Sequence, residues 1–224
     1  MNVFDLVVFD LDGTLIDSAP DLHVALNTAL RGDGRRPLTL IEVESIVGDG
    51  ATVLVRRALT LTGATVAEDD GVVALTTRFL AIYEQQGADL TRAYAGVPET
   101  LAKLAAEGFA LGVCTNKPER LSRQILQQLD LIRYFQAVIG GDSLNGIRKP
   151  DPRHLLAAVE ALGGKPERTV MVGDSVNDVA AARALGVPVI VRAGGYGQVP
   201  AQSLGADAVV QAFAELPEAI ARLA

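Results

Sequence analysis

The sequence predicts an α/β protein with a doubly wound, mostly parallel sheet and an inserted, small α-helical domain. Three observations support this prediction. Short apolar runs, several of them rich in β-branched residues, alternate with helical patterns along most of the chain. Such runs are typical of strands that are buried on both faces of a parallel sheet. One long stretch, residues 18–89, interrupts the alternation with helical patterns alone.

The elements of the alternating part follow in order. The first strand is expected at residues 6–9, directly before Asp10. The later strands are expected at residues 109–114, 137–139, 169–172 and 187–191. The helices between them are expected at residues 98–107, 118–129, 152–162 and 176–185. Three of these helices begin with a proline, which is tolerated in the first turn of a helix.

The stretch that breaks the alternation is interpreted as an inserted domain. A complete strand–helix–strand crossover takes only about 30 residues, and this stretch is far longer. We therefore expect an α/β core formed by residues 1–17 and 90–224 and a helical cap formed by residues 18–89, with linkers near residues 17–19 and 88–97. Within the cap, helices are expected at residues 21–30, 40–46, 51–61 and 69–86.

The composition excludes several kinds of protein. The 20 Lys and Arg residues against 27 Asp and Glu residues give a net charge of −7, which disfavours nucleic acid or an anionic membrane surface as a partner. No apolar run approaches the roughly 20 residues of a membrane span, and none suits a signal peptide. The single cysteine, Cys114, allows no intrachain disulfide, so the cytoplasm is the expected compartment.

The two histidines, His23 and His154, lie far apart in the sequence, so a metal site built on histidine is not expected. We expect both histidines on helix surfaces or in packing contacts of the cap.

Polar residues gather where the predicted strands end, which is where open α/β sheets bind ligands. Two carboxylates and a glycine follow the first strand, and the second strand ends before a hydroxyl and amide donors. A basic residue precedes a helix, and two further carboxylates flank the start of another. The set comprises Asp10, Asp12 and Gly13, then Thr115 and Asn116, then Lys149, and finally Asp174 and Asp178.

This set has a physical purpose in phosphoryl transfer. Crowded carboxylates are unfavourable unless a hard cation neutralises them, and Mg²⁺ prefers oxygen ligands. Thr115, the Asn116 backbone N–H and Lys149 are suited to hold the oxygens of a phosphoryl group beside that cation. One carboxylate would attack phosphorus, and a second would protonate the leaving oxygen and then deprotonate a water.

A lone aspartate after a strand is usually a solvated turn or capping residue, but three of them at one sheet edge favour a site. Asp178 also suits a first-turn helix acid, and Ser175 suits a turn and capping residue.

Four segments together resemble the four motifs of the haloacid dehalogenase-like superfamily. They are Asp10-Leu-Asp-Gly-Thr-Leu15, Thr115-Asn, Lys149-Pro and Gly173-Asp-Ser-Val-Asn-Asp178, and they occur in the superfamily's order. The resemblance covers essentially the whole chain. It implies a Rossmann-like core and a small helical cap inserted after the first motif, where the helical stretch lies.

The resemblance also implies a role for each motif residue. Asp10 is the expected nucleophile, which forms an aspartyl-phosphate, and Asp12 is the expected general acid and base. Thr115 and Lys149 would stabilise the phosphoryl group. Mg²⁺ would be bound by Asp10, Asp174 and the backbone carbonyl of Asp12, and Asp178 would orient Lys149 or metal-bound water. The dehalogenases lack the second aspartate of the first motif, so Asp12 favours phosphoryl chemistry.

Several shorter segments resemble the phosphoglycolate phosphatases within that superfamily. They include Val47-Gly-Asp-Gly-Ala51, Tyr94-Ala-Gly-Val97, Gly140-Gly-Asp142 and Gly194-Gly-Tyr-Gly197. What this resemblance implies is hydrolysis of 2-phosphoglycolate to glycolate and phosphate. The expected partner is therefore a small anionic phosphate ester, bound by a monomer or a homodimer.

In the cap, Gly48 and Gly50 precede a helix. They form either a simple turn or a backbone loop that reaches a substrate anion, and both interpretations stay open. On the following helix, Arg57 shares a face with Val53 and Leu54, whereas Arg56 lies about 100° away. Arg57 is thus the better candidate for binding a substrate carboxylate, because its fork binds carboxylates bidentately.

Three alternatives to this function remain. A phosphatase for another small ester, such as a sugar phosphate or pyrophosphate, would differ only in its cap contacts. A β-phosphoglucomutase-like phosphomutase would use the same Asp10 and Asp12 but return the phosphoryl group to a bound sugar. A non-catalytic phosphate-binding module would keep the fold, although the intact set of catalytic residue types disfavours it.

Overall fold

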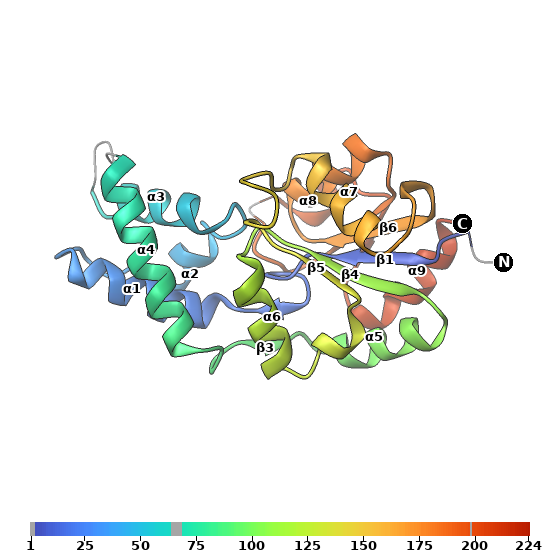
Figure 1. The fold of residues 1–224 in the computed structure, drawn as a ribbon, viewed down its shortest axis with the longest axis horizontal. Coiled ribbons are helices and arrows are strands. Elements are labelled where there is room, and N and C mark those ends of the chain that lie inside the picture. The colour runs from blue at the N-terminus through green and yellow to red at the C-terminus, as the bar shows by residue number, and fades with distance from the viewer. Residues whose placement is uncertain (1–2, 64–68, 198) are drawn as a thin grey trace.

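The computed structural model describes residues 3–63, 69–197 and 199–224, with the backbone alone at Asp69. Six parallel strands form one sheet in the order β5-β4-β1-β6-β7-β8, which confirms the predicted α/β class (Figure 1). The chain starts in the centre of the sheet, builds outward on one side and then on the other. The strands are β1 (Leu6–Phe9), β4 (Ala110–Cys114), β5 (Ala137–Ile139), β6 (Thr169–Gly173), β7 (Val189–Arg192) and β8 (Ala208–Val210).

Helices cover both faces of this sheet. One face is packed by α7 (Pro152–Ala161) and α8 (Val176–Leu185), and the other by α5 (Val97–Ala106), α6 (Glu119–Gln128) and α9 (Leu216–Arg222) (Figure 1). The sequence dictates this arrangement because β1 is apolar at every position and fully buried. Val7 and Phe9 join the core beneath one helical layer, and Leu6 and Val8 join the core beneath the other.

Local signals place the helix ends. Asp151 accepts a hydrogen bond from the backbone N–H of Arg153 at the start of α7, directly before Pro152. Ser175 and Asp178 form a reciprocal capping box at the start of α8. This capping box confirms the expected capping role of Ser175. It also gives Asp178 a structural task in addition to any chemical one.

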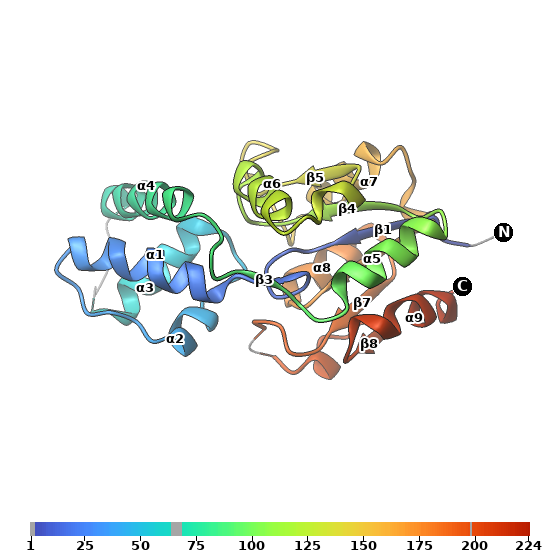
Figure 2. The same cartoon turned by 90° about the horizontal axis from the view of Figure 1, so that it is seen from below.

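Four helices form a separate layer beside the carboxyl ends of the sheet strands (Figure 2). Helix α1 packs along α4, and α3 and α2 pack against these two. Their bounds are α1 (Ala19–Gly32), α2 (Leu40–Glu44), α3 (Ala51–Leu61) and α4 (Asp69–Gln86). We refer to this layer as the helical segment. Its interpretation as a cap domain spanning residues 18–89 stays a prediction.

The sequence analysis missed two features of the fold. A pair of short antiparallel strands, β2 (Ile16–Asp17) and β3 (Arg92–Ala93), joins the chain entering the helical segment to the chain leaving it. The chain also forms one more sheet strand, β8, and then the helix α9 beyond the last predicted strand. That strand begins at Val189 rather than at residue 187, because Pro188 has no N–H to donate to the ladder.

Within the described ranges, no helix is both long enough and apolar enough to cross a membrane.

Candidate active site

The predicted catalytic residues lie together at the carboxyl end of the central strands. Asp10 follows β1, Thr115 follows β4 and Asp174 follows β6, and β1 lies between the other two strands. The order of connections reverses at β1, so this edge is the switch point of the sheet, where the loops diverge and leave room for a ligand. All three side chains are buried.

Three carboxylates form one cluster at this edge. Asp10, Asp174 and Asp178 each offer an oxygen, and these oxygens lie within 4.8 Å of one another. The ammonium of Lys149 is inserted between two of them, with Nζ 2.8 Å from Oδ1 of Asp10 and 2.6 Å from Oδ1 of Asp178. Three carboxylates and one ammonium carry a net charge of −2 when ionised. This is the charge that a divalent cation would neutralise.

Burial dominates the electrostatics of the cluster. It raises the pKa of Asp10 to about 8, although the neighbouring Lys149 lowers it in part, and it raises the pKa of Asp174 to about 7. Burial alone would lower the pKa of Lys149, but the attraction of Asp10 and Asp178 outweighs it and raises that pKa. The Lys149 ammonium is therefore retained, and it offsets only part of the negative charge of the three carboxylates.

The hydrogen bonds distinguish the three carboxylates. Oδ1 of Asp10 accepts the N–H of Leu11, and Oδ2 of Asp10 accepts nothing from the described residues. Asp178, by contrast, is saturated: Oδ1 holds Lys149, and Oδ2 accepts the N–H groups of Asp174 and Ser175 and the Ser175 hydroxyl. Asp10 thus has a free oxygen for chemistry, whereas Asp178 positions Lys149.

The Asp174 carboxylate is closely surrounded by its neighbours. Thr14 donates its hydroxyl to Oδ1 at 2.8 Å, and the backbone N–H of Tyr196 donates to Oδ2 at 2.9 Å. A Cβ atom at Gly13 or Gly195 would overlap the carboxylate. Gly13 also has φ +83°, a conformation that side chains rarely adopt. Both glycines are needed for this carboxylate to reach the cluster.

Asp12 has different partners from Asp10, although only one residue separates them. Nζ of Lys117 lies 3.0 Å from Oδ1 and 3.1 Å from Oδ2 of Asp12, and Ser18 donates its hydroxyl to Oδ1. The Asp12 side chain is not part of the three-carboxylate cluster. The sequence analysis did not assign a role to Lys117, although it stands directly after the Thr115-Asn116 pair.

Thr115 and Asn116 differ in what they offer. The oxygen of the Thr115 hydroxyl accepts the N–H of Lys117 at 3.2 Å, which leaves its own proton to donate. The Asn116 side-chain amide donates to the carbonyls of Gly48 and Lys149, each at 3.0 Å. The Asn116 side chain thus ties the helical segment to the core, and its backbone N–H remains the group that the sequence analysis predicted to bind substrate.

A cavity of about 50 Å³ lies between the core and the helical segment. One ordered water needs about 10–15 Å³, so the cavity suits a ligand of few atoms. Among its lining residues are Asp10, Asp12, Thr115, Asn116 and Lys117 from the core, with Gly48, Gly50 and Tyr83 from the helical segment. The turn at Gly48 and Gly50 therefore does reach the candidate site.

Arg57 lies elsewhere. Its guanidinium pairs with Asp49 at 2.6 Å and donates to the carbonyl of Ile46, and it lines a separate cavity of about 200 Å³. Asp49 also accepts the side-chain amide of Asn177 at 2.6 Å, which fastens this loop to α8. Arg57 is therefore a structural partner of the loop in this conformation and is not brought to the cavity at Asp10.

The expectation for His154 was wrong. His154 is fully buried beneath the Lys149 loop rather than on a helix surface. Its Nδ1 accepts the backbone N–H of Lys149 at 3.2 Å, and its Nε2 lies 2.9 Å from the carbonyl of Gly140. The first turn of α7 faces the sheet, so the His154 side chain is buried and holds the Lys149 backbone through this hydrogen bond. Burial lowers its pKa, which favours the neutral ring that these two bonds require.

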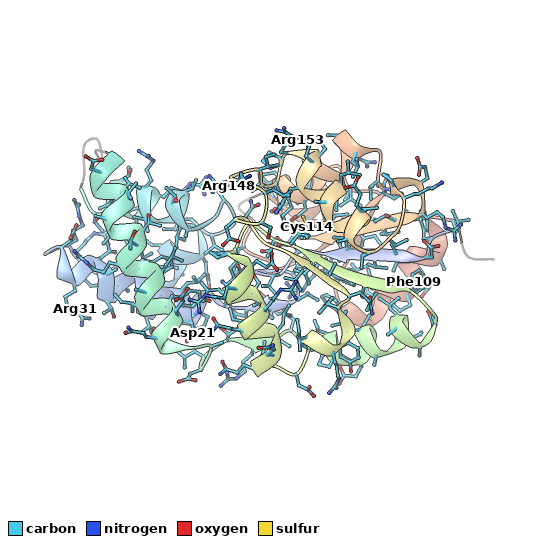
Figure 3. All side chains as sticks on the ribbon, in the orientation of Figure 1. Asp21, Arg31, Phe109, Cys114, Arg148 and Arg153 are labelled. Carbon is cyan, nitrogen blue, oxygen red and sulfur yellow. The ribbon has the colours of Figure 1, made fainter. Side chains whose placement is uncertain are left out.

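Further polar contacts that were not predicted from the sequence fix the two linkers. Asp21 joins one linker to the helical segment, and Tyr196 joins the other to the core. Asp21, labelled in Figure 3, is fully buried on α1 and accepts the N–H groups of Leu90 and Thr91. The hydroxyl of Tyr196 accepts the N–H groups of Ser18 and Ala19 and donates to Asp17. Only the tertiary structure reveals these pairs, because their members lie far apart in sequence.

Comparisons with known proteins identify the family of this chain. The model of the family "Hydrolase: haloacid dehalogenase-like hydrolase" matches residues 4–186. Phosphoglycolate phosphatase of Agrobacterium fabrum is 42% identical over 215 residues, which cover 96% of this chain and 91% of that protein. The enzyme of the same name from Caulobacter vibrioides is 44% identical over 213 residues, which cover 95% and 89%.

A solved structure described as a predicted phosphoglycolate phosphatase from Haemophilus somnus superimposes with a TM-score of 0.90. It is 32% identical in sequence and covers 97% of this chain and 98% of that one. The family model spans the helical segment and every residue of the cluster from Asp10 to Asp178. The chain belongs to the haloacid dehalogenase-like hydrolases.

Proposed function

We propose that this protein is a Mg²⁺-dependent phosphomonoester hydrolase whose substrate is 2-phosphoglycolate. One observation carries the proposal: a small cavity holds two carboxylates, Asp10 and Asp12, which have different partners and can therefore perform different tasks. The names of the relatives described above support the choice of substrate. The products are glycolate and inorganic phosphate.

Asp10 is the nucleophile in this proposal. Its Oδ2 attacks phosphorus and forms an aspartyl-phosphate while the bond from phosphorus to the ester oxygen breaks. Asp12 donates a proton to the departing oxygen, which completes glycolate. A water then attacks the phosphorus, transfers a proton to Asp12 and releases phosphate and the Asp10 carboxylate. Both residues return to their starting states.

Lys149, Thr115 and the Asn116 backbone hold the transferring group. The Lys149 ammonium next to Asp10 is placed to neutralise phosphoryl oxygens, and the Thr115 hydroxyl and the backbone N–H of Asn116 can donate to them. The helical segment supplies one wall of the cavity, and its closure over the ester would exclude bulk water, which would otherwise compete with Asp10 for phosphorus.

The donor set fits Mg²⁺. All three carboxylates of the cluster offer hard oxygens, and burial together with the neighbouring carboxylates raises the pKa values of Asp10 and Asp174. Asp10 and Asp174 would hold the ion together with the backbone carbonyl of Asp12, while Asp178, whose two oxygens are already occupied, would hold Lys149 in place. When bound, Mg²⁺ supplies positive charge to the phosphoryl oxygens.

Adding Mg²⁺ should stabilise the protein, and the effect should grow with pH. At a hundredfold excess over Kd, binding adds about 2.7 kcal/mol, which raises the Tm by about 5–10 °C for a chain of this size. Protons compete with the ion because the pKa values of Asp10 and Asp174 are about 8 and about 7, so the rise in Tm should be larger at pH 8 than at pH 6.

The matched variants are Asp174→Asn, which should lose the Mg²⁺-induced rise in Tm, and Asp130→Asn, which should keep it. Asp130 is an exposed aspartate whose φ of 57° asparagine also adopts. An equal rise in all three proteins would contradict the assignment of the metal site.

The substrate assignment is tested by phosphate release from a panel of esters. 2-Phosphoglycolate should have a kcat/KM at least about tenfold above that of glucose 6-phosphate, because the cavity of about 50 Å³ suits a short carbon chain. A sugar phosphate hydrolysed as well as 2-phosphoglycolate would overturn the narrow assignment and leave the phosphatase. An isomerised sugar phosphate among the products would instead identify a phosphomutase.

A further inference from the structure

We propose that Lys117 and Tyr83 form a carboxylate-binding subsite, so that the enzyme selects phosphate esters of short hydroxy acids through an ammonium from the core and a hydroxyl from the helical segment. This inference rests on the proposed function and names the residues that would determine its specificity. It replaces Arg57 as the candidate for the substrate carboxylate.

Lys117 has the position that such a subsite needs. Among the described residues that line the cavity, it carries the only positive charge. Its side chain is only 4% exposed, and burial alone would lower its pKa, but the attraction of Asp12 outweighs burial and raises it. The group therefore stays an ammonium. Lys149, the other buried cation of the site, lies between Asp10 and Asp178 and does not line the cavity.

Tyr83 supplies the second, independent observation. This residue is 98% buried on α4 and lines the same cavity. Its hydroxyl lies beside Lys117, which can only donate, and no described residue accepts the hydroxyl proton. A buried hydroxyl without a partner costs free energy, so an orphaned donor inside a cavity points to a ligand that completes it. Burial raises the pKa of Tyr83, so the hydroxyl keeps the proton that it would donate.

The two groups lie together. Nζ of Lys117 is 4.7 Å from the centroid of the Tyr83 ring, so the ammonium and the hydroxyl border one region of the cavity. The surrounding wall is apolar and includes Leu22, Leu54, Phe79 and Leu121. An anion in such surroundings needs a charged partner and a hydrogen bond, and these two residues provide one of each.

The distance to Asp12 selects for a short chain. Lys117 lies 3.0 Å from the carboxylate that would protonate the ester oxygen. In 2-phosphoglycolate a single methylene group separates the ester oxygen from the carboxylate. An ester oxygen bonded to Asp12 therefore brings the substrate carboxylate within reach of the neighbouring ammonium. A longer chain would have to fold back or displace the apolar wall.

Arg57 does not compete for this role, because its guanidinium pairs with Asp49 and lines the other cavity.

A substrate carboxylate bound by both Lys117 and Tyr83 would also bridge the core and the helical segment. Because Tyr83 lies on α4 and Lys117 on the core, a carboxylate bound by both would hold the two parts of the molecule together around the ester. The substrate would thus contribute to closing its own site.

The experiment compares two esters of equal chain length, 2-phosphoglycolate and 2-hydroxyethyl phosphate, which has a neutral hydroxyl in place of the carboxylate. The wild type should prefer 2-phosphoglycolate. Lys117→Met should lower kcat/KM for 2-phosphoglycolate by about 10–100-fold and for 2-hydroxyethyl phosphate by much less, because a charge-assisted contact is lost for only one ester. Tyr83→Phe should act in the same direction, by about tenfold.

Lys103→Met is the matched control, because Lys103 is an exposed lysine on α5, and it should leave both values unchanged. Equal losses for the two esters in Lys117→Met would mean that Lys117 only positions Asp12, and this would overturn the subsite. Tyr83→Phe does not change a contact of Asp12, so it decides the question if Lys117→Met fails to fold. An unchanged preference in Tyr83→Phe would remove Tyr83 from the subsite and overturn the proposal as stated.

Inhibition by glycolate separates this inference from the proposed function. If the wild type hydrolyses other esters but not 2-phosphoglycolate, the substrate assignment fails. The subsite is then supported if glycolate inhibits that hydrolysis more strongly than ethylene glycol does and if Lys117→Met abolishes the difference. It is overturned if glycolate and ethylene glycol inhibit equally.

Discussion

Replacing Asp10 with asparagine is expected to lower kcat for phosphate release from 2-phosphoglycolate by at least about 10⁴-fold. The amide nitrogen of asparagine cannot attack phosphorus as the free Oδ2 of Asp10 can. The protein should remain folded, since the substitution keeps the size of the side chain. It also removes a buried carboxyl whose charged form is disfavoured, as its pKa of about 8 indicates. The measurement is single-turnover and steady-state phosphate release, with thermal unfolding as the check on folding.

Asp130→Asn serves again as the matched control and should retain wild-type turnover. Phosphate release that survives undiminished in Asp10→Asn would rule out an aspartyl-phosphate formed on this residue. In that case the enzyme would have to use water directly or another carboxylate, and the family mechanism would not apply to this chain.

Replacing Asp12 with asparagine is expected to slow turnover of 2-phosphoglycolate by about 10²–10⁴-fold, because the departing alkoxide loses its proton donor. The loss should depend on the leaving group. Esters of acidic phenols, such as 4-nitrophenyl phosphate, leave without a proton, so their first step should be much less affected. The measurement is the rate of release of the alcohol or phenol in the first turnover for the two esters.

The same variant should accumulate phosphate bound to Asp10 when 4-nitrophenyl phosphate is the substrate, because the water that completes the reaction also needs Asp12 as a base. A burst of nitrophenol followed by a slow steady rate is the expected signature. Equal losses in the first turnover for both esters would contradict general-acid catalysis by Asp12.

The strand ends could be predicted from the sequence because the signals are local. An apolar run such as Leu6–Phe9 must be buried, and parallel strands place their carboxyl ends at one edge. The proximity of Asp10, Asp174 and Lys149 follows from that rule. The match of the helix Val176–Leu185 to its predicted bounds has a similarly local cause, since its capping residues lie next to it in the sequence.

Other parts of the site could not be predicted because they depend on how helices and loops pack in the folded chain. Arg57 shows the limit: the helical periodicity placed it correctly on a face of α3, but nothing local indicated that Asp49 would pair with it. His154 shows the same limit, because its burial depends on how α7 packs against the sheet. In both cases the partner, Asp49 or Lys149, lies only a few residues away, but the contact depends on loop and helix packing that periodicity does not encode.

The sequence by itself determined the α/β class, the edge of the sheet that carries the chemistry and the types of residue gathered there, since hydrophobic periodicity and the residues that follow each strand are local properties of the chain. Only the tertiary structure decided which partner each charged group has. In the folded chain, Lys149 lies between Asp10 and Asp178, and Lys117 pairs with Asp12. Tyr83 on α4 lines the same cavity as Asp10 and Asp12. The physical reason is that electrostatic pairing depends on distances across the fold, which the spacing of residues along the chain does not set.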